Sequence, residues 1–190
     1  MPASKDRDLA KLVLQEFLTS VAVPPDLHEG VSEACVDQFM TVEWPRPAPG
    51  TLAYLSPRYR WVIRSDDLKA CDAFWKGLAS AASVNFFMGS VSAAAIVGII
   101  GAVFSVFYSA RRKGAKLTPE QCEMLIFLKQ CEEPVGEINI AKKMADQNRE
   151  WTADRISTVL KSLEKVRAHD GTVMAVVARD SDDKWAVAAI

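Results

Sequence analysis

Apolar residues form one continuous run in the middle of the chain and follow a helical periodicity on either side of it. The run covers 25 residues from 84 to 108 without a charged side chain. At about 1.5 Å rise per residue, a helix of this length reaches roughly 37 Å, enough to cross a hydrocarbon core of roughly 30 Å. The pattern predicts a membrane-spanning helix over 84–108. The alternative is a helix in the centre of a larger soluble assembly, because such a helix is also apolar all round.

Before the run, the periodicity predicts two short helices, over 6–21 and 26–42. Their apolar positions are Leu9, Leu12, Val13, Phe17 and Leu18 in the first helix, and Leu27, Val31, Ala34, Cys35 and Phe39 in the second. The Pro-rich segment 44–50 predicts an extended linker, and 52–63 an irregular or edge-strand segment because Pro57 interrupts it. Residues 1–64 are therefore expected to form a small helical N-terminal region.

A helix start at Ser65, followed by two aspartates, leads towards the apolar run. Apolar residues between 68 and 82 keep a helical spacing up to the run itself. The pattern predicts one long helix over 65–110 that includes the span. A break near Gly77 or Asn85 is the alternative.

Small residues within the run recur on one side of the predicted helix. The positions expected to pack against another helix are Ser90, Ala94, Gly98, Gly101, Ala102 and Ser105. In lipid, close backbone approach at such positions is a main route to helix association, which predicts a homo-oligomer. The alternative is that these residues are simply common in spanning helices.

Basic residues near the two ends of the run predict its orientation. Lys69 and Lys76 precede it, whereas a cluster of four follows it: Arg111, Arg112, Lys113 and Lys116. The excess on the C-terminal side predicts a single-pass membrane protein whose C-terminal domain is cytoplasmic, with the cluster at the membrane surface. The first 20 residues lack an apolar core, so no cleavable signal peptide is expected there.

After the run, helix and strand patterns predict a domain of three helices and a β-hairpin within 111–190. Thr118, Pro119 and Gln121 form a helix-capping sequence, and Thr152 caps the third helix. Strand-like runs over 172–178 and 185–190 follow, joined by a polar turn. The predicted fold class is mainly α, with a helical N-terminal region, one long apolar helix and a C-terminal α+β domain.

The order and lengths of these C-terminal elements resemble the winged helix-turn-helix superfamily, over about residues 117–190. The resemblance implies that the third helix and the hairpin form a binding surface. Its contact residues for a protein partner or DNA would be Thr152, Arg155, Thr158, Lys161 and Lys165. Ten basic against thirteen acidic residues in 117–190, including Asp180, Asp182 and Asp183 in the hairpin turn, disfavour nucleic acid and favour a protein partner.

No arrangement of residues predicts catalysis or a bound cofactor. The two histidines, His28 and His169, lie far from each other, the four cysteines form no CxxC pair, and phosphate-binding glycine motifs are absent. We therefore expect a non-enzymatic, membrane-anchored adaptor that self-associates through its apolar helix and binds a protein partner. The alternatives are a membrane-tethered DNA-binding regulator and a membrane-inserting or permeabilising component of a larger assembly.

Overall fold

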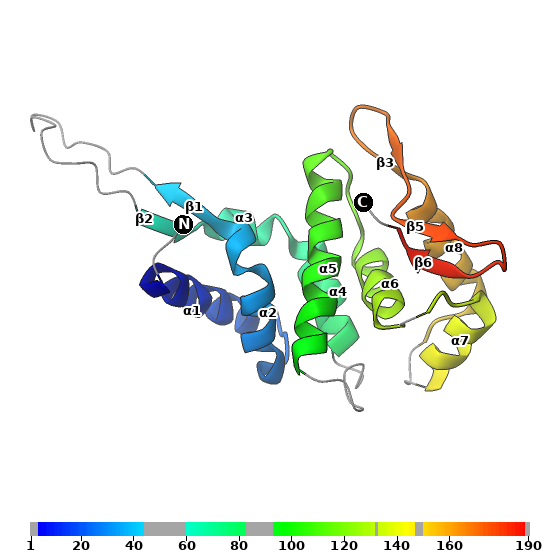
Figure 1. Cartoon of the computed structure of the whole chain (residues 1–190), viewed down its shortest axis with the longest axis horizontal. Coiled ribbons are helices and arrows are strands. Elements are labelled where there is room, and N and C mark those ends of the chain that lie inside the picture. The colour runs from blue at the N-terminus through cyan, green and yellow to red at the C-terminus, as the bar shows by residue number, and fades with distance from the viewer. Residues whose placement is uncertain (1–3, 44–59, 83–92, 132, 147–149, 189–190) are drawn as a thin grey trace, which may run out of the picture.

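The computed structural model describes residues 4–43, 60–82, 93–131, 133–146 and 150–188. Within these ranges the chain forms eight helices and six short strands, which confirms the mainly helical fold class. Helix α5 (Ala93–Arg112) stands at the centre of the molecule (Figure 1). Helices α1 (Ser4–Ser20) and α2 (Pro25–Phe39) lie on one side of it, and the C-terminal elements lie on the other.

Helices α1 and α2 pack along each other through aliphatic side chains. The buried positions of α1 are Ala10, Leu14 and Leu18 at a spacing of four, while Leu9, Leu12 and Val13 are about half-exposed. The helix predicted at the N-terminus is thus confirmed, but its inward face is rotated from the predicted stripe. The reason is that α2 contacts α1 on the side that also carries Arg7 and Lys11.

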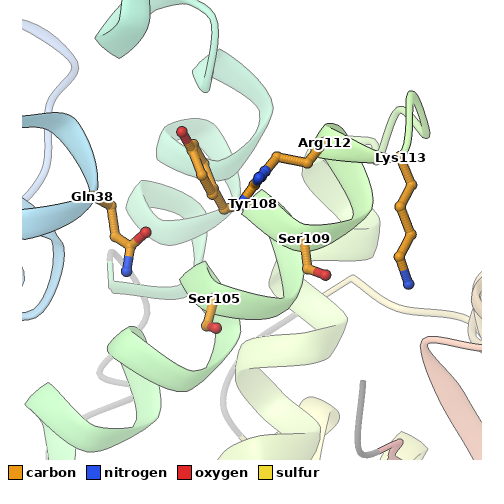
Figure 2. A pocket seen from close by; sticks show the side chains of 6 residues that line it. All are labelled: Gln38, Ser105, Tyr108, Ser109, Arg112 and Lys113. Carbon is orange, nitrogen blue, oxygen red and sulfur yellow. The ribbon is translucent and has the colours of Figure 1, made fainter. Parts of the chain in front are cut away.

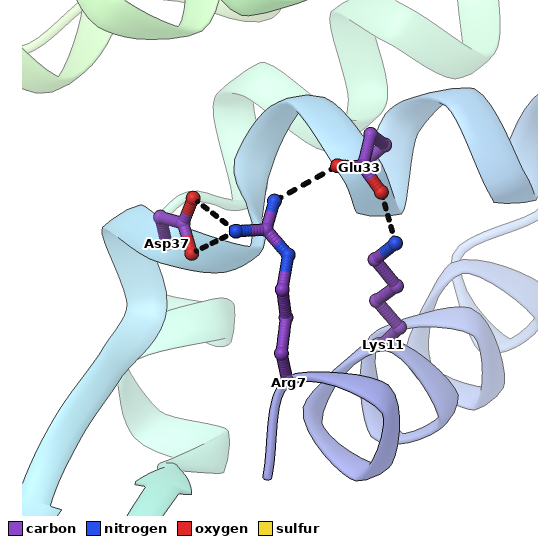
Figure 3. A network of polar contacts seen from close by, with 4 residues as sticks. All are labelled: Arg7, Lys11, Glu33 and Asp37. Atoms are coloured by element: carbon purple, nitrogen blue, oxygen red, sulfur yellow. Dashed lines mark hydrogen bonds and ion pairs between the residues drawn. The ribbon is translucent and has the colours of Figure 1, made fainter. Parts of the chain in front are cut away.

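Ion pairs join the polar edges of these two helices (Figure 3). Arg7 donates to both carboxylate oxygens of Asp37 at 2.9 and 2.8 Å and to Glu33 at 2.9 Å, and Lys11 pairs with the other oxygen of Glu33. The hydrogen bond from Lys11 is the main reason that the pKa of Glu33 lies below its ordinary value, and Arg7 lowers it further. The network fixes the register of α1 on α2.

A two-stranded antiparallel sheet follows α2. Strand β1 (Met40–Glu43) pairs with β2 (Arg60–Ile63), and Met40 is opposite Ile63. Residues 40–42, predicted as the end of the second helix, therefore belong to a strand. The edge strand predicted over 52–63 is present at 60–63, and the linker predicted over 44–50 lies outside the described residues.

Residues 65–82 do not form the predicted continuous helix. Helix α3 (Ser65–Lys69) ends before Cys71, and α4 (Asp72–Ala82) starts a new helix. The carbonyl of Leu68 accepts hydrogen bonds from the backbone N–H of Cys71 and from the buried indole Nε1 of Trp75, at 3.0 and 2.8 Å. An uninterrupted helix would need that carbonyl for the N–H of Asp72. Residues 83–92, which include the alternative break at Asn85, lie outside the described residues.

The face of α5 between Ile100 and Ala110 enters an aromatic core. The ring centroid of Phe104 lies 5.2 Å from that of Phe39 on α2 and 4.9 Å from that of Phe74 on α4. Trp75 lies between the same elements, with its centroid 6.1 Å from that of Phe104. The apolar helix therefore connects the N-terminal helices to α4.

The C-terminal part contains α6 (Pro119–Gln130), α7 (Glu137–Asp146) and α8 (Ala153–Glu164). The predicted capping sequence of α6 is confirmed, since Thr118 and Gln121 exchange side-chain and backbone hydrogen bonds. Strand β5 (Val177–Arg179) pairs with β6 (Trp185–Val187), and Trp185 also bridges to Val135. Strands β3 (Val166–Arg167) and β4 (Val173–Met174) form a further small hairpin, so the run predicted over 172–178 is divided.

Two glycines on adjacent helices allow a matched test of this packing. A Cβ at Gly77 of α4 would lie 2.7 Å from Cys122 Cβ of α6, whereas a Cβ at Gly98 of α5 would meet no atom within 4 Å. We expect Gly77→Ala to lower the free energy of unfolding by about 1–3 kcal/mol through overpacking. Gly98→Ala should raise it by up to about 1 kcal/mol through helix propensity. Urea unfolding of the full chain measures both, and shifts of equal sign would contradict the close contact of α4 with α6.

The ion-pair network predicts a pH-dependent contribution to stability. The pKa of Glu33 is lowered in the folded protein, so its stabilisation is present above the ordinary value of 4.5 and is lost as pH falls through the lower, folded value. We expect Glu33→Gln to cost about 0.5–1 kcal/mol at neutral pH, because the pairs are partly exposed. Unfolding at neutral pH and at about pH 3 measures the change, with the exposed Glu16→Gln as control. A cost for Glu33→Gln that stays constant over this range would contradict the assignment.

Candidate functional site

Helix α5 has one buried face and one open face. Ile100, Val103, Phe104, Phe107 and Ala110 are buried in the core. The side towards solvent carries small residues, with Ala94, Gly98 and Ser105 exposed and Ala102 half-buried. This combination makes α5 the main candidate for a functional element.

The predicted helix-packing residues are divided between these environments. Ala94, Gly98, Ala102 and Ser105 share the open side, where a Cβ at Gly98 meets no atom within 4 Å. Gly101 instead contacts α2, since a Cβ there would lie 3.6 Å from Ala34 Cβ. Ser90 lies outside the described residues. Of the described small residues, Gly101 therefore packs against another helix of the same chain, and the other four lie on the side towards solvent.

Helix α2 covers part of the apolar helix at close range. A Cβ at Gly30 of α2 would lie 3.1 Å from Cγ2 of Val97. The remaining surface of α2 is acidic, with Glu29, Glu33 and Asp37 over the same length of helix. Ionised carboxylates are costly in a hydrocarbon core. Consequently, α2 cannot accompany α5 across a bilayer in this arrangement.

The basic cluster after the apolar run does not form one surface. Nη1 of Arg111 lies 3.2 Å from Sγ of Cys71, and Arg111 and Lys116 line one hollow beside Leu117. Arg112 and Lys113 line a hollow of about 470 Å³ between the ends of α2 and α5 (Figure 2). Its other lining residues are Gln38, Ser105, Tyr108 and Ser109. The sequence gives no signal for Gln38, which is distant along the chain and comes close only because α2 packs on α5.

The predicted partner-binding residues of α8 fall into two groups. Thr152 caps the helix by accepting the N–H of Arg155, as predicted. The guanidinium of Arg155 pairs with Glu120 at 2.5 Å and lies 4.7 Å from the ring centroid of Trp151. Thr158, Lys161 and Lys165 are exposed on one face. Thr152 and Arg155 are exposed too, but their side chains are engaged in the contacts just described.

The turn between β5 and β6 is held by local polar contacts. Arg179 pairs with Glu137 at 3.2 Å and with Asp183 at 2.7 Å, while Asp180 accepts the backbone N–H groups of Asp182 and Lys184. Exposed Asp182 and Asp183 leave the turn acidic. The turn therefore presents negative charge on a rigid support.

The four cysteines are free thiols, three of them buried and Cys131 half-buried. Burial raises the pKa of Cys35 and Cys122, and it outweighs the opposing effect of Arg111 on the pKa of Cys71. These thiols are therefore protonated and unreactive at neutral pH. Among the residues that the structure describes, no group of three His, Cys, Asp or Glu side chains is placed to hold a metal ion.

One helix in the described part of the chain, Ala94–Arg112, is long and apolar enough to cross a membrane by length and composition, and 28% of its most apolar window is buried. A core helix of a soluble protein can have the same properties. Comparison of the chain with protein-family models, curated proteins and solved structures finds no match.

Proposed function

We propose that this protein is a non-enzymatic adaptor that associates with membranes through α5 and binds a protein partner through its C-terminal domain. The observation that carries the proposal is the character of α5. Its apolar length suits a bilayer, most of its surface is not deeply buried, and Arg111 and Arg112 follow in its last turn. Basic residues at that end favour a cytoplasmic C-terminal domain in a single-pass arrangement.

Membrane association is conditional in this proposal. In the arrangement described, α5 contacts α2 through Gly30 and Gly101, and α4 through Phe104. Since α2 carries carboxylates along its length, it has to separate from α5 before that helix crosses lipid. The compact arrangement is then the water-compatible form, in which part of the apolar helix is covered. An adaptor of this kind would insert into membranes only after α2 separates, so the proposal includes part of the membrane-inserting alternative.

Self-association along the open face of α5 completes the adaptor proposal. Ala94, Gly98, Ala102 and Ser105 allow another helix to approach closely, and in lipid such approach adds van der Waals contact that bulky residues would prevent. Oligomers would multiply the partner-binding domains at one membrane site. Linked copies then bind with higher avidity than single domains.

The C-terminal domain supports the partner-binding part of the proposal. Helices α6, α7 and α8, the bridge from Val135 to Trp185 and the β5–β6 hairpin follow the order expected for a winged helix. A protein partner suits the surface better than DNA. Lys161 and Lys165 favour phosphate, but exposed Asp154 on the same face of α8 and the acidic turn repel it.

A reversible link between α2 and α5 tests the conditional association. Gly30→Cys combined with Val97→Cys places two thiols where the helices touch. We expect the oxidised double variant to remain soluble after incubation with phosphatidylcholine vesicles. Reduction with dithiothreitol should restore carbonate-resistant sedimentation, because α2 is then free to leave. Either single variant, which cannot form this link, is the matched control.

Two results would contradict the proposal. Carbonate-resistant sedimentation of the oxidised variant at the level of the reduced one would show that α2 does not need to separate. Absence of carbonate-resistant protein in every sample, including the unmodified chain, would remove membrane insertion and leave α5 as a core helix.

The open face of α5 predicts a second outcome. Gly98→Leu combined with Ala102→Leu should reduce chemical crosslinking between copies on vesicles severalfold, because the larger side chains hold the helices apart. Sedimentation with the vesicles should not change, since leucine suits lipid at least as well. Val106→Leu, a conservative change on the same helix, is the control. Unchanged crosslinking of the double variant would exclude this face from self-association.

A further inference from the structure

The hollow at the C-terminal end of α5 has a lining that differs from the rest of the helix. It is formed by Gln38 of α2, by four residues of α5 and by Lys113 directly after α5, and its volume is about 470 Å³. Figure 2 shows Ser105, Ser109 and Lys113 along one side of α5, with Tyr108 and Arg112 beside them and Gln38 facing them from α2. The hollow is thus a polar site at the end of an apolar helix.

The lining consists mainly of hydrogen-bond donors. It contains one guanidinium, one ammonium, three hydroxyls and one carboxamide, and no carboxylate. Arginine presents N–H groups in a fork that matches two oxygens of a phosphate, and lysine and hydroxyl groups add single donors. This set of groups is suited to a phosphate.

Within the described part of the chain, no carboxylate occupies the two cations, which is also true of exposed lysines such as Lys129 and Lys142. Arg7, Lys76 and Arg179 each pair with a carboxylate. Arg112 and Lys113 make no ion pair with any residue in the described ranges. One carboxylate, Asp67, lines an adjoining hollow that shares Arg112 and Tyr108. The negative end of the α5 dipole also opposes an anion, but two full positive charges exceed both effects near the surface.

We propose that this hollow binds a phosphate group, with Arg112 and Lys113 as its charged ligands and Ser105 and Ser109 as neutral donors. The inference rests on the proposed membrane association, because the end of a spanning helix lies at the depth of lipid headgroups. Four of the six lining residues belong to α5 and Lys113 follows it directly, so most of the site stays with that helix when α2 separates. The same chemistry fits a free phosphate in solution.

Vesicle binding of the full chain tests the site. The probes are vesicles of phosphatidylcholine alone and vesicles that also contain phosphatidic acid, whose headgroup is a phosphate monoester. We expect phosphatidic acid to strengthen binding, and Arg112→Gln with Lys113→Gln to remove roughly 30-fold of that gain. Ser105→Ala with Ser109→Ala, which keeps the charge, should remove roughly three- to tenfold. Lys129→Gln with Lys142→Gln, exposed cations on α6 and α7, is the charge-matched control and should have little effect.

The controls distinguish a specific phosphate site from nonspecific electrostatic attraction between the protein and anionic vesicles. Equal losses in Arg112→Gln/Lys113→Gln and in the Lys129/Lys142 control, or no loss in the serine variant, would overturn the proposal. Thermal unfolding of each variant shows that the loss is not a folding defect. Selective binding of phosphatidic acid that inorganic phosphate does not compete identifies the lipid headgroup as the ligand.

Calorimetric titration with inorganic phosphate shows whether the ligand is free phosphate or a lipid headgroup. It also tests the phosphate site independently of membrane association. Saturable heat that disappears in Arg112→Gln/Lys113→Gln, with no binding to either vesicle, supports the phosphate site and overturns membrane association. Binding to phosphatidylcholine without any preference for phosphatidic acid, and without phosphate heat, overturns the site and leaves membrane association intact.

Discussion

The aromatic contact around Phe104 determines how the halves of this molecule meet. Its ring lies within about 6 Å, centroid to centroid, of Phe39, Phe74 and Trp75, which come from α2 and α4. Buried aromatic side chains contribute large apolar areas and further ring–ring attraction. Through this contact, helix α5 connects the N-terminal helices with α4, and it also packs on α6.

The inward orientation of Phe104 produces the asymmetry on which the functional proposals depend. With Phe104 inward, Gly101 faces Ala34 of α2, and Gly98 faces solvent. A helix apolar enough for lipid is thus covered on one side by a helix with carboxylates. The carboxylates of α2 are favourably hydrated in water, whereas the apolar side chains of α5 are favoured in lipid. The two helices therefore suit different surroundings. The proposed membrane association therefore requires a second arrangement, and the contact of Gly30 with Val97 belongs to the one described.

The sequence periodicity predicted most helices and the capping of α6 and α8, because these depend on neighbouring residues. The periodicity did not predict features that depend on contacts outside the helical repeat. The helix expected over 65–82 is interrupted where the carbonyl of Leu68 accepts hydrogen bonds from the indole of Trp75 and the N–H of Cys71, and helical periodicity does not indicate these bonds. The inward face of α1 is set by α2, which leaves Leu9 and Leu12 exposed. At the candidate site, Ser105, Arg112 and Lys113 were among the predicted residues, whereas Tyr108 and Ser109 were not, and Gln38 could be assigned only from the packing of α2 on α5.

The basic residues after the apolar run show why counting charges does not describe a binding site. Successive residues of a helix point about 100° apart. Arg111 therefore reaches Cys71, whereas Arg112, one position further, lines the hollow with Ser109. Lys113 follows the last residue of α5 and lines the same hollow. Membrane orientation depends on how many cations lie at one end, and it is the same whichever way they point. A binding site instead needs groups that line one hollow, and the proposed phosphate site therefore rests on the two cations that line a hollow with hydroxyl groups.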